Sequence, residues 1–368
     1  MKTGIIYVLL PLVLLGCSKK ANETPGRSQP IPNPQTLPKG AVPEIPFGVT
    51  FVETPETKEI NDISNHANAL LETKDYDGLD TFAGKLRDSR ACYDGGAWKF
   101  YFVYVGLDLP EEASNSVWAA RLTALQEYIN ARTNSITARV AMANDLVTYA
   151  WKARGSDWAD TVTDEGWRLF GERLNEAAKV LDSARSLKAR CPYWWSVLLT
   201  TDLGLQVERS QYDATFAEAT LAWPDYTAYY NRRAWYLMPR WYGSAGEWES
   251  DLTKSADRKG GDAGDLLYAR VIWCMHHSYA YTNIFKECNL SWPRVDKGFA
   301  VMEKQFPNSL AAKSEHAYLA VLARDAAVAR KEFDELQGRV DLSIWPNPAK
   351  FAVFAYWTYS PDHKFPGQ

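Results

Sequence analysis

Apolar side chains recur along most of this chain at the spacings of three and four residues that are typical of an amphipathic helix. The clearest stripes are Trp118, Leu122, Leu125 and Ile129; Ile136, Val140, Ala143, Val147 and Trp151; and Val295, Phe299, Met302 and Phe306. No segment alternates apolar and polar positions between hairpin turns, as strands would. The pattern therefore predicts an all-α fold, in which the ambiguous apolar run 100–105 is also helical.

A longer stripe begins at Trp167 and continues to Lys188, which predicts a helix of about 25 residues. Thr163 is the expected N-cap, because its hydroxyl can accept a hydrogen bond from the first turn. Asp164 and Glu165 follow it, where their negative charge favours the positive end of the helix dipole.

Prolines mark the places where several helices must stop. Pro192, Pro224 and Pro307 each stand between two apolar stripes. Pro192 and Pro224 are 32 residues apart, close to the period of tetratricopeptide repeats. This spacing predicts an α-solenoid of degenerate tetratricopeptide-like helical hairpins, in which neighbouring hairpins share one apolar core.

The N-terminus has the pattern of an export signal. Lys2 precedes an apolar run too short to span a membrane, and Leu14-Leu15-Gly16-Cys17 resembles the lipobox of bacterial lipoproteins. The resemblance implies that 1–16 is a lipoprotein signal peptide and that Cys17 becomes an acylated, palmitate-bearing first residue. Ser18 in place of Asp favours the outer membrane, with the protein facing the periplasm. An ordinary cleaved signal, or an uncleaved anchor, is the alternative.

Residues 17–48 are rich in proline, which favours an extended chain and leaves little to form a core: Pro25, Pro30, Pro32, Pro34, Pro38, Pro43 and Pro46. At roughly 3 Å per residue such a tether reaches about 90 Å from the membrane. The helical-repeat domain then occupies 49–368.

Composition excludes one class of partner. The formal net charge is only −4, with both signs interspersed, so there is no basic surface for nucleic acid. The unusual feature is the aromatic content, with fifteen Trp and twenty Tyr.

Four cysteines follow Cys17, and an exported protein can oxidise them. Cys274 and Cys288 are closest in sequence and are the predicted disulfide. Four buried thiols, including Cys92 and Cys191, are the equally weighted alternative.

Several segments resemble a bacterial family of tetratricopeptide-like proteins that is known only as a domain of unknown function: 70–80, 94–98, 236–244, 246–249 and 264–270. The resemblance extends from about residue 55 to 345. It implies a helical-repeat fold, but no activity, cofactor or catalytic residue.

One of these segments supplies the candidate binding patch: Arg240, Trp241, Tyr242, Glu247, Trp248 and Asp265. In a structural role, the two Trp side chains would wedge adjacent helices, and Arg240 would pair with Glu247 or Asp265. In a functional role, the patch would line a concave face and stack on sugar rings or grip a peptide.

Motifs for catalysis and metal binding are weak. His276 and His277 lie near Cys274 and Cys288, but adjacent histidines on a helix point about 100° apart, so we assign no metal site. No catalytic residue and no cofactor is assigned. Glu247, Glu249 and Asp251 are interpreted as a solvated helix face, since glycoside cleavage needs a carboxyl group in an apolar pocket and a substrate groove.

Two functions follow as hypotheses. The first is a non-enzymatic envelope lipoprotein, anchored in a membrane by lipid, whose helical repeats bind a protein or peptide. The alternative is a protein that binds or cleaves peptidoglycan or another glycan with an aromatic and acidic groove.

Overall fold

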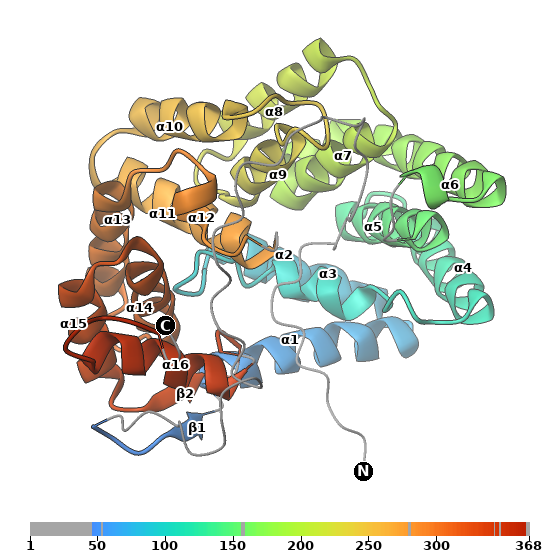
Figure 1. Ribbon diagram of the computed structural model, residues 1–368. Coiled ribbons are helices and arrows are strands. Elements are labelled where there is room, and N and C mark those ends of the chain that lie inside the picture. Colours follow the sequence, from blue (N-terminus) through green and yellow to red (C-terminus); the bar gives the residue numbers. More distant parts are fainter. Residues whose placement is uncertain are drawn as a thin grey trace. The chain divides into compact units, whose positions relative to one another are not determined.

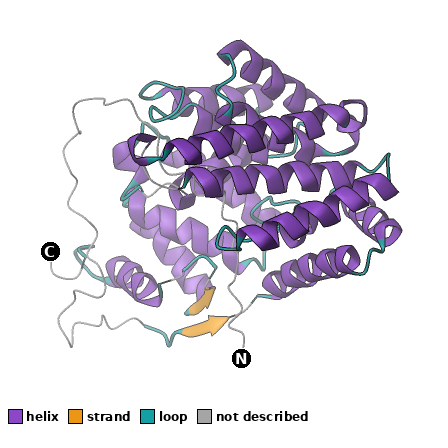
Figure 2. Cartoon of the chain, turned by 90° about the vertical axis from the view of Figure 1, so that its right-hand side faces the viewer, coloured by secondary structure: helices purple, strands orange, loops and turns teal. Residues whose placement is uncertain are grey.

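The computed structural model of the protein describes residues 46–52, 54–155, 159–278, 281–341, 343–345 and 347–365. The predicted signal peptide 1–16, Cys17 and nearly all of the tether 17–48 lie outside the described residues. Helices make up most of the described chain, which confirms the all-α prediction (Figures 1 and 2). The strands there are β1, Thr50–Val52, and β2, Arg339–Asp341, which pair in parallel with Phe51 opposite Val340.

The described residues form two compact units. We call 58–245 the N-terminal unit, and 46–57 together with 246–365 the C-terminal unit. The predicted domain 49–368 therefore contains two units, each with its own apolar core.

The elements of the N-terminal unit are helical throughout: α1 (Pro55–Glu72, which starts just before residue 58), α2 (Tyr76–Ser89), α3 (Tyr101–Leu107), α4 (Asn115–Ala131), α5 (Ile136–Arg154), the short 3-10 helix η2 (Ala159–Thr161), α6 (Asp164–Ser183), the 3-10 helix η3 (Arg185–Arg190), α7 (Pro192–Gly204), α8 (Arg209–Ala222) and α9 (Ala228–Tyr236). Helix α3 confirms the helical assignment of the run 100–105.

The C-terminal unit holds both strands and the remaining helices: α10 (Glu247–Lys259), α11 (Gly261–Ser278), α12 (Ile284–Glu287), α13 (Trp292–Gln305), α14 (Leu310–Ala323), α15 (Ala326–Leu336) and α16 (Pro348–Tyr359). In both units, several helices that follow one another along the chain pack together, among them α4 with α5, α5 with α6, and α14 with α15, while α11 packs against α13. This pairing is what short connections between amphipathic helices produce.

Helix α6 begins as predicted and ends early. Thr163 is its N-cap and accepts a hydrogen bond from the Gly166 backbone N–H at 3.0 Å. The predicted helix to residue 188 is wrong, because α6 stops at Ser183. Residues 185–190 instead wind into the tighter helix η3, which turns the chain toward Pro192 at the first position of α7.

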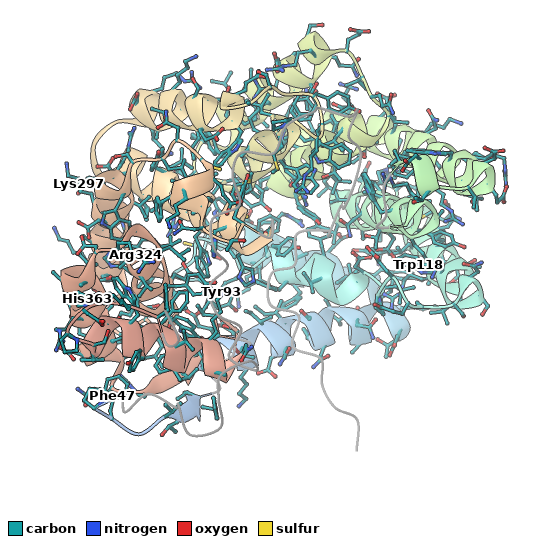
Figure 3. The ribbon with its side chains drawn as sticks, viewed as in Figure 1. Phe47, Tyr93, Trp118, Lys297, Arg324 and His363 are labelled. Carbon is teal, nitrogen blue, oxygen red and sulfur yellow. The ribbon has the colours of Figure 1, made fainter. Side chains whose placement is uncertain are left out.

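The aromatic side chains are used mainly inside the units. Trp118, which is labelled in Figure 3, lies among the helices of the N-terminal unit. Its ring stacks on Tyr149 with centroids 4.9 Å apart, and Tyr212 stacks on Tyr236. The most completely buried tryptophans of the described chain are Trp118, Trp194, Trp248, Trp345 and Trp357. Core packing therefore explains much of the aromatic excess, since each such ring buries a large apolar area.

Helix α5 is buried on nearly every side, and its polar residues meet inside the N-terminal unit. Asp108, which ends α3, accepts hydrogen bonds from Asn144 Nδ2 at 2.9 Å and Thr148 Oγ1 at 3.0 Å. Burial raises the pKa of Asp108 to about 6. Asp145 has no exposed surface, and its carboxyl group interacts with that of Asp108. Burial, and then the charge of Asp108, raise the pKa of Asp145 well above its ordinary value.

We predict that Asp145→Asn stabilises the protein at neutral pH. As pH rises above about 3.8, the unfolded chain releases the Asp145 proton and the folded chain keeps it, so the free energy of unfolding falls. Each unit of raised pKa costs about 1.4 kcal/mol above both pKa values. Urea unfolding of both proteins at pH 7.5 and pH 4 measures this, with the gain of the variant expected to shrink toward zero at pH 4. A variant that is less stable at pH 7.5 would contradict the prediction.

Candidate functional site

The six residues of the predicted patch are divided between the units. Arg240, Trp241 and Tyr242 lie in the loop 237–243 that follows α9 in the N-terminal unit. Glu247 and Trp248 begin α10, and Asp265 lies on α11, all in the C-terminal unit.

The residues of the C-terminal unit have structural roles. Trp248 is buried on α10, as the wedge interpretation predicted. Asp265 accepts a hydrogen bond from Arg294 Nε at 2.8 Å, and Arg294 also pairs with Asp257 at 2.6 Å. Glu249 is buried, which raises the pKa of its carboxyl group. The interpretation of 247, 249 and 251 as a solvated helix face is therefore wrong for Glu249, which turns toward the interior.

The loop 237–243 folds back on the end of α9. Pro239 interrupts the helix, and the Trp241 backbone N–H bonds to the Met238 carbonyl at 2.8 Å. The Tyr242 N–H returns to the Tyr236 carbonyl at 3.1 Å, so the chain closes a tight turn. A Cβ atom at Gly243 would lie 1.9 Å from the Leu237 carbonyl oxygen, so only glycine fits this turn.

This loop forms one wall of a pocket with a volume of about 580 Å³. The other walls come from α5, α6 and the end of α7, so the whole pocket belongs to the N-terminal unit. The side chains that give it its character are Trp151, Arg154, Trp167, Phe170, Arg240, Trp241 and Tyr242. The volume lies in the range of about 300 to 1,000 Å³ that is usual for small-ligand sites.

Aromatic rings hold the pocket walls together. Trp241 meets Trp151 edge to face with centroids 5.9 Å apart, and Trp151 meets Phe170 at 4.7 Å. Tyr242 donates a hydrogen bond from its hydroxyl to the Leu203 carbonyl at 3.0 Å, which ties the loop to α7. The ring positions are therefore fixed before any ligand arrives.

Two guanidinium groups accompany the rings. Arg154 is buried, and its guanidinium lies 5.5 Å from the centroid of the Trp167 ring. Arg240 lies over Trp235 at 4.5 Å. Arg154 donates to the Gly155 carbonyl at 3.1 Å. The planar donor set of a guanidinium suits carboxylates and hydroxyl-rich ligands.

The pocket also contains hydrogen-bond donors that the protein does not use. In the described part of the chain, the indole Nε1 atoms of Trp151 and Trp241 are buried without a hydrogen-bond partner. A ligand with acceptor oxygens would pair with these N–H groups. Buried indoles outside the pocket, such as those of Trp118 and Trp357, also lack a partner among the described residues. None of the described lining residues is acidic.

The predicted disulfide is not formed. Cys92, Cys191, Cys274 and Cys288 all carry thiols in the structure. Cys274 Sγ lies 3.9 Å from Ser278 Oγ on its own helix, whereas burial raises the pKa of Cys288 to about 12, beside Tyr281 and Glu249. The two sulfurs are thus directed to different neighbours.

Cys274, His276, His277 and Cys288 do not form a group that could hold an ion among the described residues. His276 is buried, and burial, followed by the charges of Lys350 and His277, lowers its pKa to about 3. The His276 imidazole is therefore neutral near pH 7. Within the described residues, the side chains that do meet at metal-binding distances are Glu303, His316 and Glu332, which the sequence patterns did not single out.

Comparison with family models, curated proteins and solved structures finds no match to this chain. Nor does any helix in the described ranges combine the length and the apolar character needed to cross a bilayer. The family resemblance and the lipid anchor therefore stay predictions.

Sequence reasoning found three pocket residues and missed the others. The sequence pattern assigns three of the missed residues to core stripes: Trp151, Trp167 and Phe170. A ring that lines a pocket has the same helical spacing as a ring in a core, so spacing cannot separate the two. Arg154 gave a possible signal, since an arginine in the last turn of a buried helix needs an internal partner.

We predict that Gly243→Ala distorts the loop that forms one wall of the pocket and destabilises the protein. The added methyl group would collide with the Leu237 carbonyl, and overpacking of this kind costs about 1 to 3 kcal/mol. Thermal unfolding measures the loss. Gly171→Ala on α6 is the matched control, because its Cβ meets nothing within 4 Å. An alanine in a helix is expected to leave stability unchanged or to raise it by about 0.5 to 1 kcal/mol. Equal stability of the two variants would contradict the account of the turn.

Proposed function

We propose that this protein is a bacterial envelope lipoprotein that binds an acidic glycan in the aromatic pocket of the N-terminal unit. The observation that carries this proposal is the pairing of fixed indole rings with two guanidinium groups in one small-ligand pocket. We further propose that the helices form degenerate tetratricopeptide-like hairpins. Packing between successive helices supports that reading.

The chemistry of the pocket favours rings that carry acceptor oxygens. Flat indole faces suit the apolar face of a sugar ring, while the unused Nε1–H groups of Trp151 and Trp241 suit its oxygens. Arg154 and Arg240 favour a carboxylate on the same ligand.

The same groups disfavour other ligands. An aromatic cage alone would attract a quaternary ammonium group, but the two arginines repel a cation. Since the described lining residues include no carboxyl group, we propose binding without cleavage.

Tryptophan fluorescence titration of the protein with soluble peptidoglycan fragments and with uronic-acid oligosaccharides tests the ligand. We expect Trp241→Ala and Arg240→Met each to weaken binding at least tenfold, because they remove a stacking face and a carboxylate donor. The matched control is Trp273→Ala, a half-buried tryptophan on α11 that does not line the pocket. It should bind as the wild type does.

Two outcomes would overturn the glycan proposal. One is the absence of saturable binding to either sugar probe. The other is equal loss in Trp241→Ala and Trp273→Ala. Binding of an acidic peptide pool in the same pocket, with no sugar binding, would instead support the protein or peptide partner predicted from the repeats.

The anchor is tested separately. We expect a fatty-acid analogue fed to expressing bacteria to label the protein, and Cys17→Ala to abolish the label. Cys92→Ala is the matched control and should stay labelled. Label that persists in Cys17→Ala would exclude this cysteine as the lipid attachment site.

A further inference from the structure

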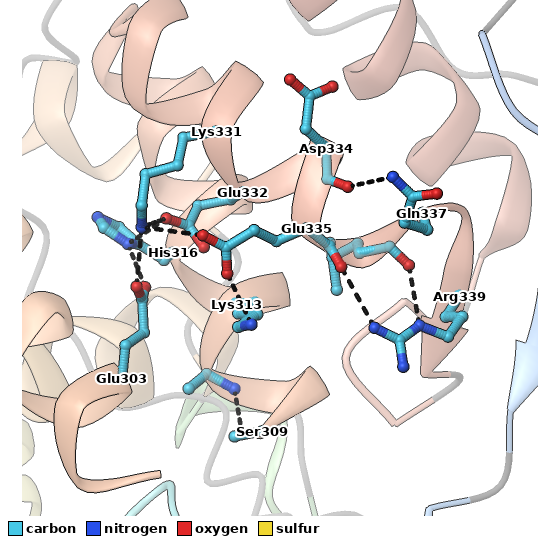
Figure 4. A network of polar contacts seen from close by, with 12 residues as sticks. Glu303, Ser309, Lys313, His316, Lys331, Glu332, Asp334, Glu335, Gln337 and Arg339 are labelled. Carbon is cyan, nitrogen blue, oxygen red and sulfur yellow. Dashed lines mark hydrogen bonds and ion pairs between the residues drawn. The ribbon is translucent and has the colours of Figure 1, made fainter. Parts of the chain in front are cut away.

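Three helices of the C-terminal unit bring a compact set of charged side chains together (Figure 4). Asp296 and Glu303 lie on α13, His316 on α14, and Lys331 and Glu332 on α15. This cluster is separate from the aromatic pocket, which belongs to the N-terminal unit.

His316 stands at its centre with both ring nitrogens facing carboxylates. Its Nδ1 is 2.7 Å from Glu303 Oε1 and 3.5 Å from Glu332 Oε1. One ligand atom from each of these three residues lies within 4.8 Å of the others. Tetrahedral zinc with bonds of 2.0 to 2.2 Å places its ligand atoms about 3.4 Å apart, so only small movements are needed.

The imidazole is already oriented as a metal ligand would be. Its Nε2 is 3.2 Å from Asp296 Oδ1, and its ring stacks on Phe299 with centroids 4.9 Å apart. Metal-binding histidines normally donate the second ring N–H to such a carboxylate, which fixes the ring and leaves the other nitrogen for the metal. Asp296 therefore fits the role of a positioning residue.

Glu332 gives an independent indication of a missing ligand. Its side chain is fully buried, and within the described part of the chain its Oε2 atom has no hydrogen-bond partner. A buried carboxylate oxygen without a partner is costly, and a bound cation would remove that cost.

When no ion is bound, the Lys331 ammonium group pairs with the carboxylates of the cluster. Its ammonium group donates to Glu303 Oε2 at 3.0 Å and to Glu332 Oε1, while 54% of its side chain is exposed. Burial opposes a charge on His316, but hydrogen bonds to Asp296, Glu303 and Glu332 raise its pKa to about 10. Without an ion, the Lys331 ammonium group and the His316 ring therefore face the carboxylate oxygens that an ion would bind.

We infer that Glu303, His316 and Glu332 form a binding site for a divalent transition-metal ion of the zinc type, over which Lys331 closes in the absence of metal. Imidazole with carboxylate is a ligand set that suits such ions. On binding, His316 releases its Nδ1 proton to solvent and the Lys331 side chain moves outward.

Titration of the full chain with Co²⁺, followed by its visible absorption and by displacement with Zn²⁺, tests the site. We expect one ion per chain, and binding at least tenfold weaker in His316→Gln and in Glu303→Gln. Lys331→Met is expected to bind at least tenfold more tightly, because it removes the ammonium group that competes for the same carboxylates. A purely structural ion network predicts no gain in that variant.

Lys313→Met is the matched control. Lys313 pairs with Glu335 at 2.6 Å on the same pair of helices, outside the three proposed ligands, so its loss should leave metal affinity unchanged. Far-UV circular dichroism confirms that each variant is folded. Absence of saturable Co²⁺ binding in both wild type and Lys331→Met would overturn the inference. So would binding that is unchanged in His316→Gln and Glu303→Gln, since the cysteine thiols or other side chains would then hold the ion.

Discussion

Each unit depends on a helix that is covered on nearly all sides, α5 in the N-terminal unit and α14 in the C-terminal unit. Polar side chains on such a helix cannot reach water, so they must meet partners inside the protein or remain costly. Asn144 and Thr148 on α5 are satisfied by Asp108, and His316 on α14 is satisfied by acids from two other helices. The need for such partners explains why a buried polar network lies at each of these two helices.

The two buried networks differ in the charge state of their titratable groups. Around Asp108 and Asp145, two acids share an apolar environment, and their pKa values rise because burial disfavours the charged form. Around His316, acids and bases alternate, and hydrogen bonds to three carboxylates overcome the effect of burial and keep the imidazole charged. In the first network, the folded chain holds a proton that the unfolded chain releases, which destabilises the protein at neutral pH. The second network links α13, α14 and α15 through ion pairs.

The aromatic pocket arises from the same architecture. Trp151 and Arg154 lie in the last turn of α5, and the loop 237–243 forms another wall of the pocket. That loop holds its shape through Pro239, Gly243 and its backbone hydrogen bonds. Rings fixed by contacts with one another lose little freedom when a ligand binds, so the pocket is preorganised.

Helical periodicity, proline positions and capping residues determined the all-α fold, the N-cap at Thr163 and the helical state of the run 100–105 from sequence alone, because these depend on residues close together in the chain. The end of α6, the thiols of Cys274 and Cys288, and the division of the predicted patch between two units depended on tertiary structure. The aromatic pocket and the His316 cluster also depended on tertiary structure. Side-chain spacing shows which residues share a helix face, but only packing between helices decides whether that face meets a core, a cavity or an opposite charge.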